Sequence, residues 1–119
     1  NSVSFIGFRA LHDNGEELDF VYQDGAQTAP TEVIANIAAM VADTWVKIGF
    51  LYDPLEDAAR RISIYLNNVK QNTYVTNTNI DAATFPENDA MTFVLCGKVG
   101  AAAAATLDID WWYCCQSYE

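Results

Sequence analysis

The chain alternates hydrophobic and polar residues over several short stretches that are separated by turn-forming residues. A period of two is typical of β-strands, because successive side chains on a strand point to opposite faces. Residues 45–52 show it most clearly. One face carries Val46, Ile48, Phe50 and Tyr52, and the other carries Trp45, Lys47, Gly49 and Leu51. Pro54 follows directly and ends this predicted strand.

The same alternation predicts further strands in both halves of the chain. They are expected at residues 2–9, 16–22, 60–66, 69–75, 91–98 and 106–113. In residues 16–22, Leu18, Phe20 and Tyr22 share one face, and Glu17 and Asp19 share the other. Residues 54–59, 77–85 and 100–105 are expected to be connections. Asn67-Asn68 tolerates the positive φ that a tight hairpin requires.

Residues 31–41 fit two patterns. Their apolar positions match a helical stripe, whereas Thr31-Glu32-Val33-Ile34 also suits the start of a strand. Because the surrounding segments are strands, we predict a strand that ends in a short turn.

Seven or eight short strands separated by turns predict an all-β fold, an antiparallel β-sandwich. The period excludes a helical bundle, and the lack of long helical crossovers excludes a parallel α/β fold. The 119 residues suit a single domain over residues 1–119. The chain begins without Met and is strand-like at once, so we favour its being the C-terminal part of a longer chain.

The charge balance narrows the choice of partners. Sixteen Asp and Glu face six Lys and Arg, which gives a formal net charge of -10. Phosphate contacts need clustered basic residues, so nucleic acid is excluded as a direct ligand, and an anionic membrane surface is disfavoured. No apolar run approaches the roughly 20 residues that span a bilayer. The hydrophobic fraction of 51% is too high for a disordered tail.

Four runs of the sequence carry a resemblance to a known family. They are Trp45-Val46-Lys47-Ile48-Gly49-Phe50, Ile62-Ser63-Ile64-Tyr65-Leu66-Asn67-Asn68-Val69, Thr84-Phe85-Pro86-Glu87-Asn88-Asp89 and Leu107-Asp108-Ile109-Asp110-Trp111-Trp112. Together they resemble the concanavalin A-like, laminin-G-like jelly rolls, and more narrowly those of tailed-phage virion proteins. The resemblance covers residues 45–112. Asn68 departs from it, because the family pattern usually has Gly there, and 119 residues are few for a complete roll.

The resemblance implies a virion structural protein, a capsid decoration or head accessory subunit, assembled in the host cytoplasm. It implies adhesion to capsid or tail subunits, and we expect a homo-oligomer on the particle. We expect no enzymatic activity, no cofactor and no metal. The clustered aromatic residues agree with the composition of interface cores. Candidates for the interface, or for stacking on a glycan, are Trp45, Tyr65, Trp111, Trp112 and Tyr113, with polar support from Asn67, Asp108 and Asp110.

Two other functions stay open. In a carbohydrate-binding module for particle attachment, aromatic rings stack on a pyranose and Asp110 or Asn67 fixes its hydroxyls. Laminin-G-like domains sometimes use calcium, for which the candidate ligands here are Asp53, Asp108 and Asp110. The usual fate of strand aromatics is a core or a subunit interface, so we rank glycan binding second.

A degenerate glycoside hydrolase ranks third. Alternation places Asp108 and Asp110 on one strand face, about 6.8 Å apart. Retaining hydrolysis needs carboxylates about 5–5.5 Å apart. Laminarinase-type jelly rolls, which share the expected fold, carry Glu-x-Asp-x-Glu or Glu-x-Asp-x-x-Glu on one strand, whereas positions 112 and 113 here are Trp and Tyr, so the third acid is absent.

The cysteines and the histidine predict no further chemistry. Cys96, Cys114 and Cys115 are odd in number and lack the spacing of a zinc site, so we expect three reduced thiols packed as small apolar groups. His12 is expected to be a solvated loop residue.

Overall fold

The computed structural model describes residues 4–11, 15, 17–57, 60–86 and 108–115. Within these residues it has six strands and one short helix. They are β1 (Phe5–Ala10), β2 (Glu17–Gln23), β3 (Thr31–Ala39), β4 (Ile48–Tyr52), β5 (Ile62–Leu66), β6 (Val69–Val75) and α1 (Asn77–Ile80). The chain divides into two compact units, Asn1–Asp89 and Ala90–Glu119, and all seven elements belong to the first.

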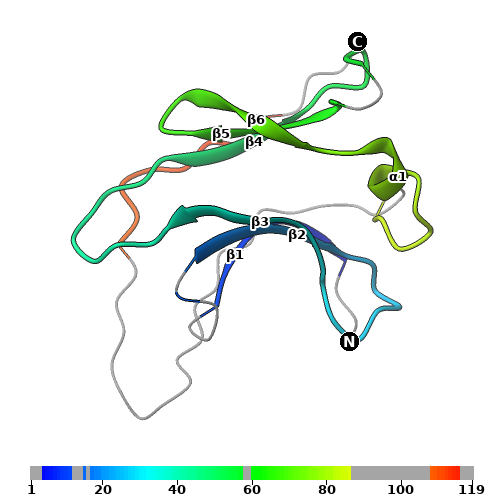
Figure 1. Cartoon of the computed structure of the whole chain (residues 1–119), viewed down its shortest axis with the longest axis horizontal. Helices are drawn as coiled ribbons and strands as arrows, with labels where there is room; N and C mark the ends of the chain where they lie inside the picture. Colours follow the sequence, from blue (N-terminus) through cyan, green and yellow to red (C-terminus); the bar gives the residue numbers. More distant parts are fainter. Residues whose placement is uncertain (1–3, 12–14, 16, 58–59, 87–107, 116–119) are drawn as a thin grey trace. The chain divides into compact units, whose positions relative to one another are not determined.

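The first unit is built from two antiparallel sheets of three strands each (Figure 1). One sheet has the order β1-β2-β3 and the other has the order β4-β5-β6, so each strand pairs with its neighbour in sequence. The predicted antiparallel, mostly β structure is confirmed for this unit. The ambiguous segment 31–41 contains β3, as the strand interpretation predicts.

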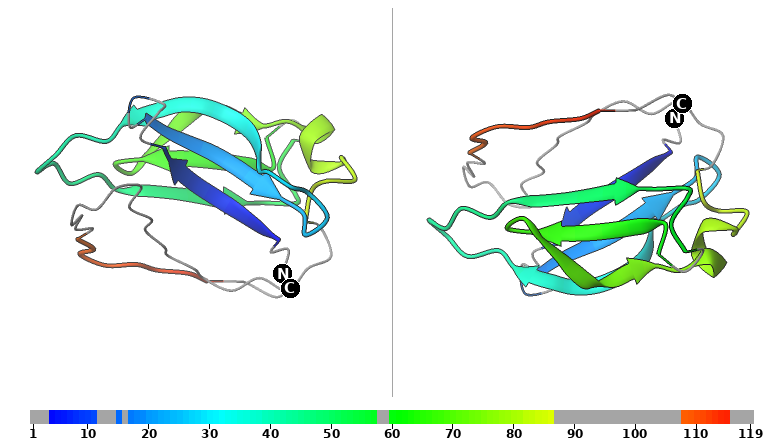
Figure 2. Two further views of the ribbon diagram at one scale, coloured as in Figure 1. Left: turned by 90° about the horizontal axis from the view of Figure 1, so that it is seen from below. Right: turned by 90° about the horizontal axis from the view of Figure 1, so that it is seen from above.

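The two sheets share one hydrophobic core. Phe20 on β2 has its ring centroid 5.2 Å from those of Phe8 on β1 and Phe50 on β4, so ring contacts join the sheets. Figure 2 shows the strands of the two layers crossing at an angle. The buried members of this core are Phe20, Tyr22, Ile62, Ile64, Val75, Ile80 and Phe85.

Strand β2 is the central strand of its sheet, and its residues 18–22 are buried on both faces. The alternation places Asp19 on the face opposite Phe20, and in the structure Asp19 is fully buried on that face. Its carboxylate lies 3.6 Å from Arg9 Nη2 and accepts a hydrogen bond from the Asn36 backbone N–H. Asn36 has φ +58° where the register between β2 and β3 shifts, so Asp19 also fixes the irregular part of this ladder.

The β5–β6 hairpin turns at Asn67 and Asn68, whose φ angles are +50° and +67°. The prediction for this pair is confirmed, because two consecutive positive φ values are what the tight turn demands. The Asn67 side chain also reaches the neighbouring strand, since its Oδ1 accepts a hydrogen bond from the Lys47 backbone N–H at 3.0 Å. The turn is thus tied to the start of β4.

We expect Asn67→Ala to lower the free energy of unfolding by about 1–2 kcal/mol. The variant loses the hydrogen bond to Lys47 and places a residue without a compensating side chain at positive φ. Urea denaturation followed by far-UV circular dichroism measures the change. Asn68→Ala is the matched control, because Asn68 has the same φ constraint but is not the residue whose amide accepts the Lys47 N–H. An equal loss in both variants would contradict the role given to the Asn67 amide.

Three predicted elements differ from the structure. The connection 77–85 contains helix α1, a single turn that buries Ile80 against the core and that no sequence pattern predicted. The strand predicted from residue 45 begins at Ile48. Residues 108–113 lie in neither helix nor strand, so the predicted last strand is not found there. The predicted strand 91–98, the connection 100–105, Cys96 and His12 lie outside the described residues.

Candidate functional site

Strand β4 presents large hydrophobic side chains at the edge of its sheet. Ile48, Phe50, Leu51 and Tyr52 are each exposed by 40% to 52%. Trp45, which precedes the strand, is more exposed still. Monomeric soluble proteins seldom leave contiguous hydrophobic surface uncovered, so this edge is a candidate contact surface.

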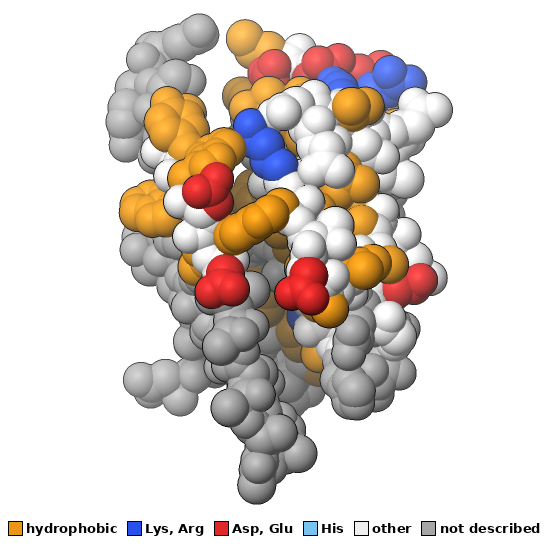
Figure 3. Space-filling view, turned by 90° about the vertical axis from the view of Figure 1, so that its left-hand side faces the viewer, with side chains coloured by type: hydrophobic (Ala, Val, Ile, Leu, Met, Phe, Trp, Pro, Cys, Tyr) orange, Lys and Arg blue, Asp and Glu red, His pale blue; other side chains and the backbone are white. Residues whose placement is uncertain are grey.

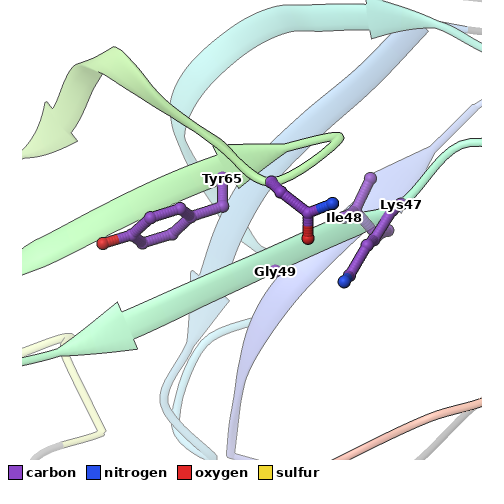
Figure 4. Close-up of a pocket in the computed structure, with 5 residues that line it drawn as sticks. Lys47, Ile48, Gly49 and Tyr65 are labelled. Atoms are coloured by element: carbon purple, nitrogen blue, oxygen red, sulfur yellow. The ribbon is translucent and has the colours of Figure 1, made fainter.

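A shallow depression of about 290 Å³ lies on the outer face at this edge (Figure 4). It is lined by Lys47, Ile48, Gly49, Tyr65 and Asn68. A Cβ added at Gly49 would meet no atom within 4 Å, so the space beside this residue is open. The lining offers an ammonium group, an aromatic ring and an amide, which suit binding a side chain or a small polar group. It lacks a nucleophile paired with a base.

The structure brings together only some of the candidate residues. Half-buried Tyr65 lines the depression, and Asn67 lies next to Asn68 in the hairpin beside it. Trp45 is exposed before β4 and is not part of the lining. Lys47, Gly49 and Asn68 were not predicted as site residues. A glycine within an otherwise alternating strand was the available signal, since it often marks a close approach.

The remaining candidates lie in the second compact unit, within residues 108–115. All eight residues of this segment are exposed. Of the two expected fates of strand aromatics, a core or a subunit interface, Trp111, Trp112 and Tyr113 do not show the first, since they are 56%, 62% and 76% exposed. Asp108 and Asp110 are exposed too, and because they are not on a strand, the separation expected for a hydrolase pair has no basis here.

The two described cysteines, Cys114 and Cys115, are free but exposed, which corrects the expectation that they pack as small apolar groups. Both cysteines also affect the pKa of the neighbouring Tyr113. The pKa of Tyr113 is raised above its ordinary value, first because its side chain hydrogen-bonds with that of Cys115. Negative charge on Cys115, partial desolvation and negative charge on Cys114 act in the same direction. Tyr113 therefore stays neutral to a higher pH than an isolated tyrosine.

Figure 3 shows hydrophobic side chains reaching the surface of one face between acidic and basic ones. Among the described residues, no three His, Cys, Asp or Glu side chains gather in a group able to hold a metal ion. In the same residues, no helix is long and apolar enough to cross a membrane.

Comparison with known proteins adds no relative. No protein-family model, curated protein or solved structure matches the chain significantly. The resemblance to virion jelly rolls therefore depends on the four sequence runs alone.

Proposed function

We propose that this chain is a structural protein of a tailed-phage virion, a capsid decoration or head accessory subunit that acts by binding other virion proteins. The single observation that carries the proposal is the exposure of Trp111, Trp112 and Tyr113 together in one short segment. Trp and Tyr are the residues most enriched among the hot spots of protein interfaces. Burying each of these rings against a partner stabilises the contact by about 2 kcal/mol.

The proposal includes a finer fold, the antiparallel jelly-roll sandwich of the concanavalin A-like proteins. Two three-stranded antiparallel sheets with a shared core support it. The net charge of -10 supports the assembly role, because like-charged subunits repel each other in solution and stay away from packaged DNA. Neither nucleic acid nor a membrane is a partner in this proposal.

The test is the composition of purified particles from an infection in which the chain is expressed. We expect the chain in the particles at a fixed ratio to the major capsid protein. Trp112→Ala is expected to reduce that ratio by about tenfold, the effect of losing one strong interface anchor. Val69→Ala is the matched control, because Val69 is also an exposed hydrophobic residue but lies on β6. Particles without the chain, from lysates that contain it, would overturn the proposal.

Glycan binding is the second candidate, since the same exposed rings stand beside the exposed carboxylates of Asp108 and Asp110. Rings stack on the apolar face of a sugar while carboxylates accept hydrogen bonds from its hydroxyls. A glycan array with the purified chain, followed by calorimetry on any hit, separates the two functions. Sugar affinity that is lost in Trp112→Ala places glycan binding first. No affinity for any sugar leaves protein adhesion in place.

A further inference from the structure

We propose that two copies of this chain associate through the free edge of β4, as antiparallel strands related by a twofold axis that passes next to Phe50. Among the described residues, no strand pairs with that edge, because β4 is the terminal strand of the order β4-β5-β6. This inference goes beyond the proposed function: it concerns the purified chain in solution and holds whether or not the chain is found in particles.

The hydrogen bonds to β5 decide which backbone groups of β4 point outward. The Asn67 N–H donates to the Lys47 carbonyl, and the Asp53 N–H donates to the Arg61 carbonyl, each at 2.7 Å. Both ends of β4 are therefore bonded toward β5 at odd-numbered positions. Because the direction alternates along an antiparallel ladder, the N–H and C=O groups of the even-numbered residues face the free edge. These residues are Ile48, Phe50 and Tyr52.

The outward groups restrict the register of a second copy. A ladder forms only if outward residues face outward residues, so even-numbered positions must oppose even-numbered positions. Centring the pair on Phe50 uses all of them: Phe50 opposes Phe50 of the second copy, and Ile48 opposes Tyr52. A shift of two residues leaves one of these outward residues in each copy unpaired. The result is a continuous sheet of six strands, three from each copy.

Charge complementarity selects the same register. With Phe50 opposite itself, Lys47 lies directly opposite Asp53 of the second copy, and the pair occurs twice by symmetry. Lys47 and Asp53 form a non-hydrogen-bonded pair of the antiparallel ladder, in which the side chains of opposite residues approach most closely. Asp53 is held at the strand end, because its Oδ1 accepts the Leu55 backbone N–H at 2.9 Å. A carboxylate has a second oxygen with which to accept a cation.

The sizes of the opposing side chains favour the same register as the charges do. The register places Leu51 of one copy opposite Gly49 of the other, on the outer face. Leu51 is 52% exposed, and the depression beside Gly49 and Tyr65 is open. The leucine side chain therefore enters the space that the missing Cβ of Gly49 leaves. Hydrophobic, electrostatic and backbone requirements are met by one arrangement, which is why we assign the edge to a second copy of this chain.

The first test is sedimentation velocity of the full chain over a range of concentrations. An interface of one strand from each copy is small, so we expect a reversible dimer with a dissociation constant in the micromolar range. Added salt is expected to weaken it, because the two Lys47–Asp53 pairs are near solvent. A parent chain that is monomeric at millimolar concentration would overturn the inference. So would β4 amides that are protected from hydrogen exchange in a monomer, because the chain itself then covers the edge.

Charge reversal distinguishes the loss of a specific interface from the loss of self-association through a damaged fold. Lys47→Asp and Asp53→Lys each place like charges opposite each other twice, and each is expected to weaken self-association by about tenfold or more. An equal mixture of the two variants restores both opposite-charge pairs, so we expect a heterodimer with close to the parent affinity. A damaged fold gives no such recovery. Absence of recovery, or equal weakening by Val69→Asp on the far edge strand β6, would overturn the inference.

Discussion

Asp19→Ala is expected to lower the free energy of unfolding by about 3 kcal/mol, because it breaks a buried ion pair from one side. Asp19 is fully buried, and its carboxylate lies 3.6 Å from the Arg9 guanidinium. Its removal takes a negative charge from the mostly buried Arg9 and leaves the Asn36 N–H without this acceptor. Urea denaturation followed by far-UV circular dichroism measures the loss.

Two variants assign the loss to the buried group. Glu32 also pairs with Arg9, at 3.1 Å, but its side chain is 44% exposed. Glu32→Ala is therefore expected to cost at most about 1 kcal/mol, as exposed pairs do. Asp19→Asn keeps an oxygen for the Asn36 N–H and loses only the charge, so its cost is expected to lie between the two. Similar losses in Asp19→Ala and Glu32→Ala would contradict a special role for the buried carboxylate.

Much of the first unit was predictable because alternation and turn chemistry are local properties. Strands β2, β5 and β6 lie within a residue or two of their predicted ranges. The Asn67-Asn68 turn depends only on the residue types that accept positive φ. The prediction of a strand at residues 31–41 depended on the neighbouring segments, since the pattern of these residues fitted a helix equally well. In this case the surrounding strands outweighed local propensity.

Asp19 shows what a local pattern cannot provide. Alternation places it on the face opposite Phe20, but whether that face meets water depends on the strands that pair on either side of β2. Here β1 contributes the Arg9 guanidinium and β3 contributes the Asn36 N–H, so the carboxylate of Asp19 is buried beside a cation and a hydrogen-bond donor. Helix α1 was missed for a similar reason. Its four residues have little periodicity, and it is held by the burial of Ile80.

The candidate site divides in the same way. Alternation correctly separated Phe50 from Leu51, so that Phe50 packs on Phe20 while Leu51 remains exposed. The same pattern predicted a strand at residues 106–113, yet residues 108–113 form none in the structure. A period of two states which side chains would share a face, but a strand also needs a partner for its backbone groups. The edge position of β4 depends on the whole sheet order and was not visible in its sequence.

Phe20→Ala is expected to have the largest effect of any single substitution in the core, about 3–5 kcal/mol. Phe20 is fully buried, and its ring contacts Phe8 in its own sheet and Phe50 in the other, each at a centroid distance of 5.2 Å. Truncation removes both ring contacts and leaves a cavity between the layers. Chemical denaturation at low temperature measures the change, because a loss of this size is a large part of the stability of a small domain.

Two comparisons determine whether Phe20 joins the two sheets. Phe20→Leu keeps most of the volume and is expected to cost at most about 1.5 kcal/mol, so it stays folded even if the alanine variant does not. Phe50→Ala removes the opposite ring of the contact, but Phe50 is 41% exposed and leaves a space that water can enter. Its cost is expected to be about half that of Phe20→Ala, in proportion to the area withdrawn from water. If Phe20→Ala cost no more than Phe50→Ala, the two sheets would not depend on a common core, because the ring between them would then behave as a surface group.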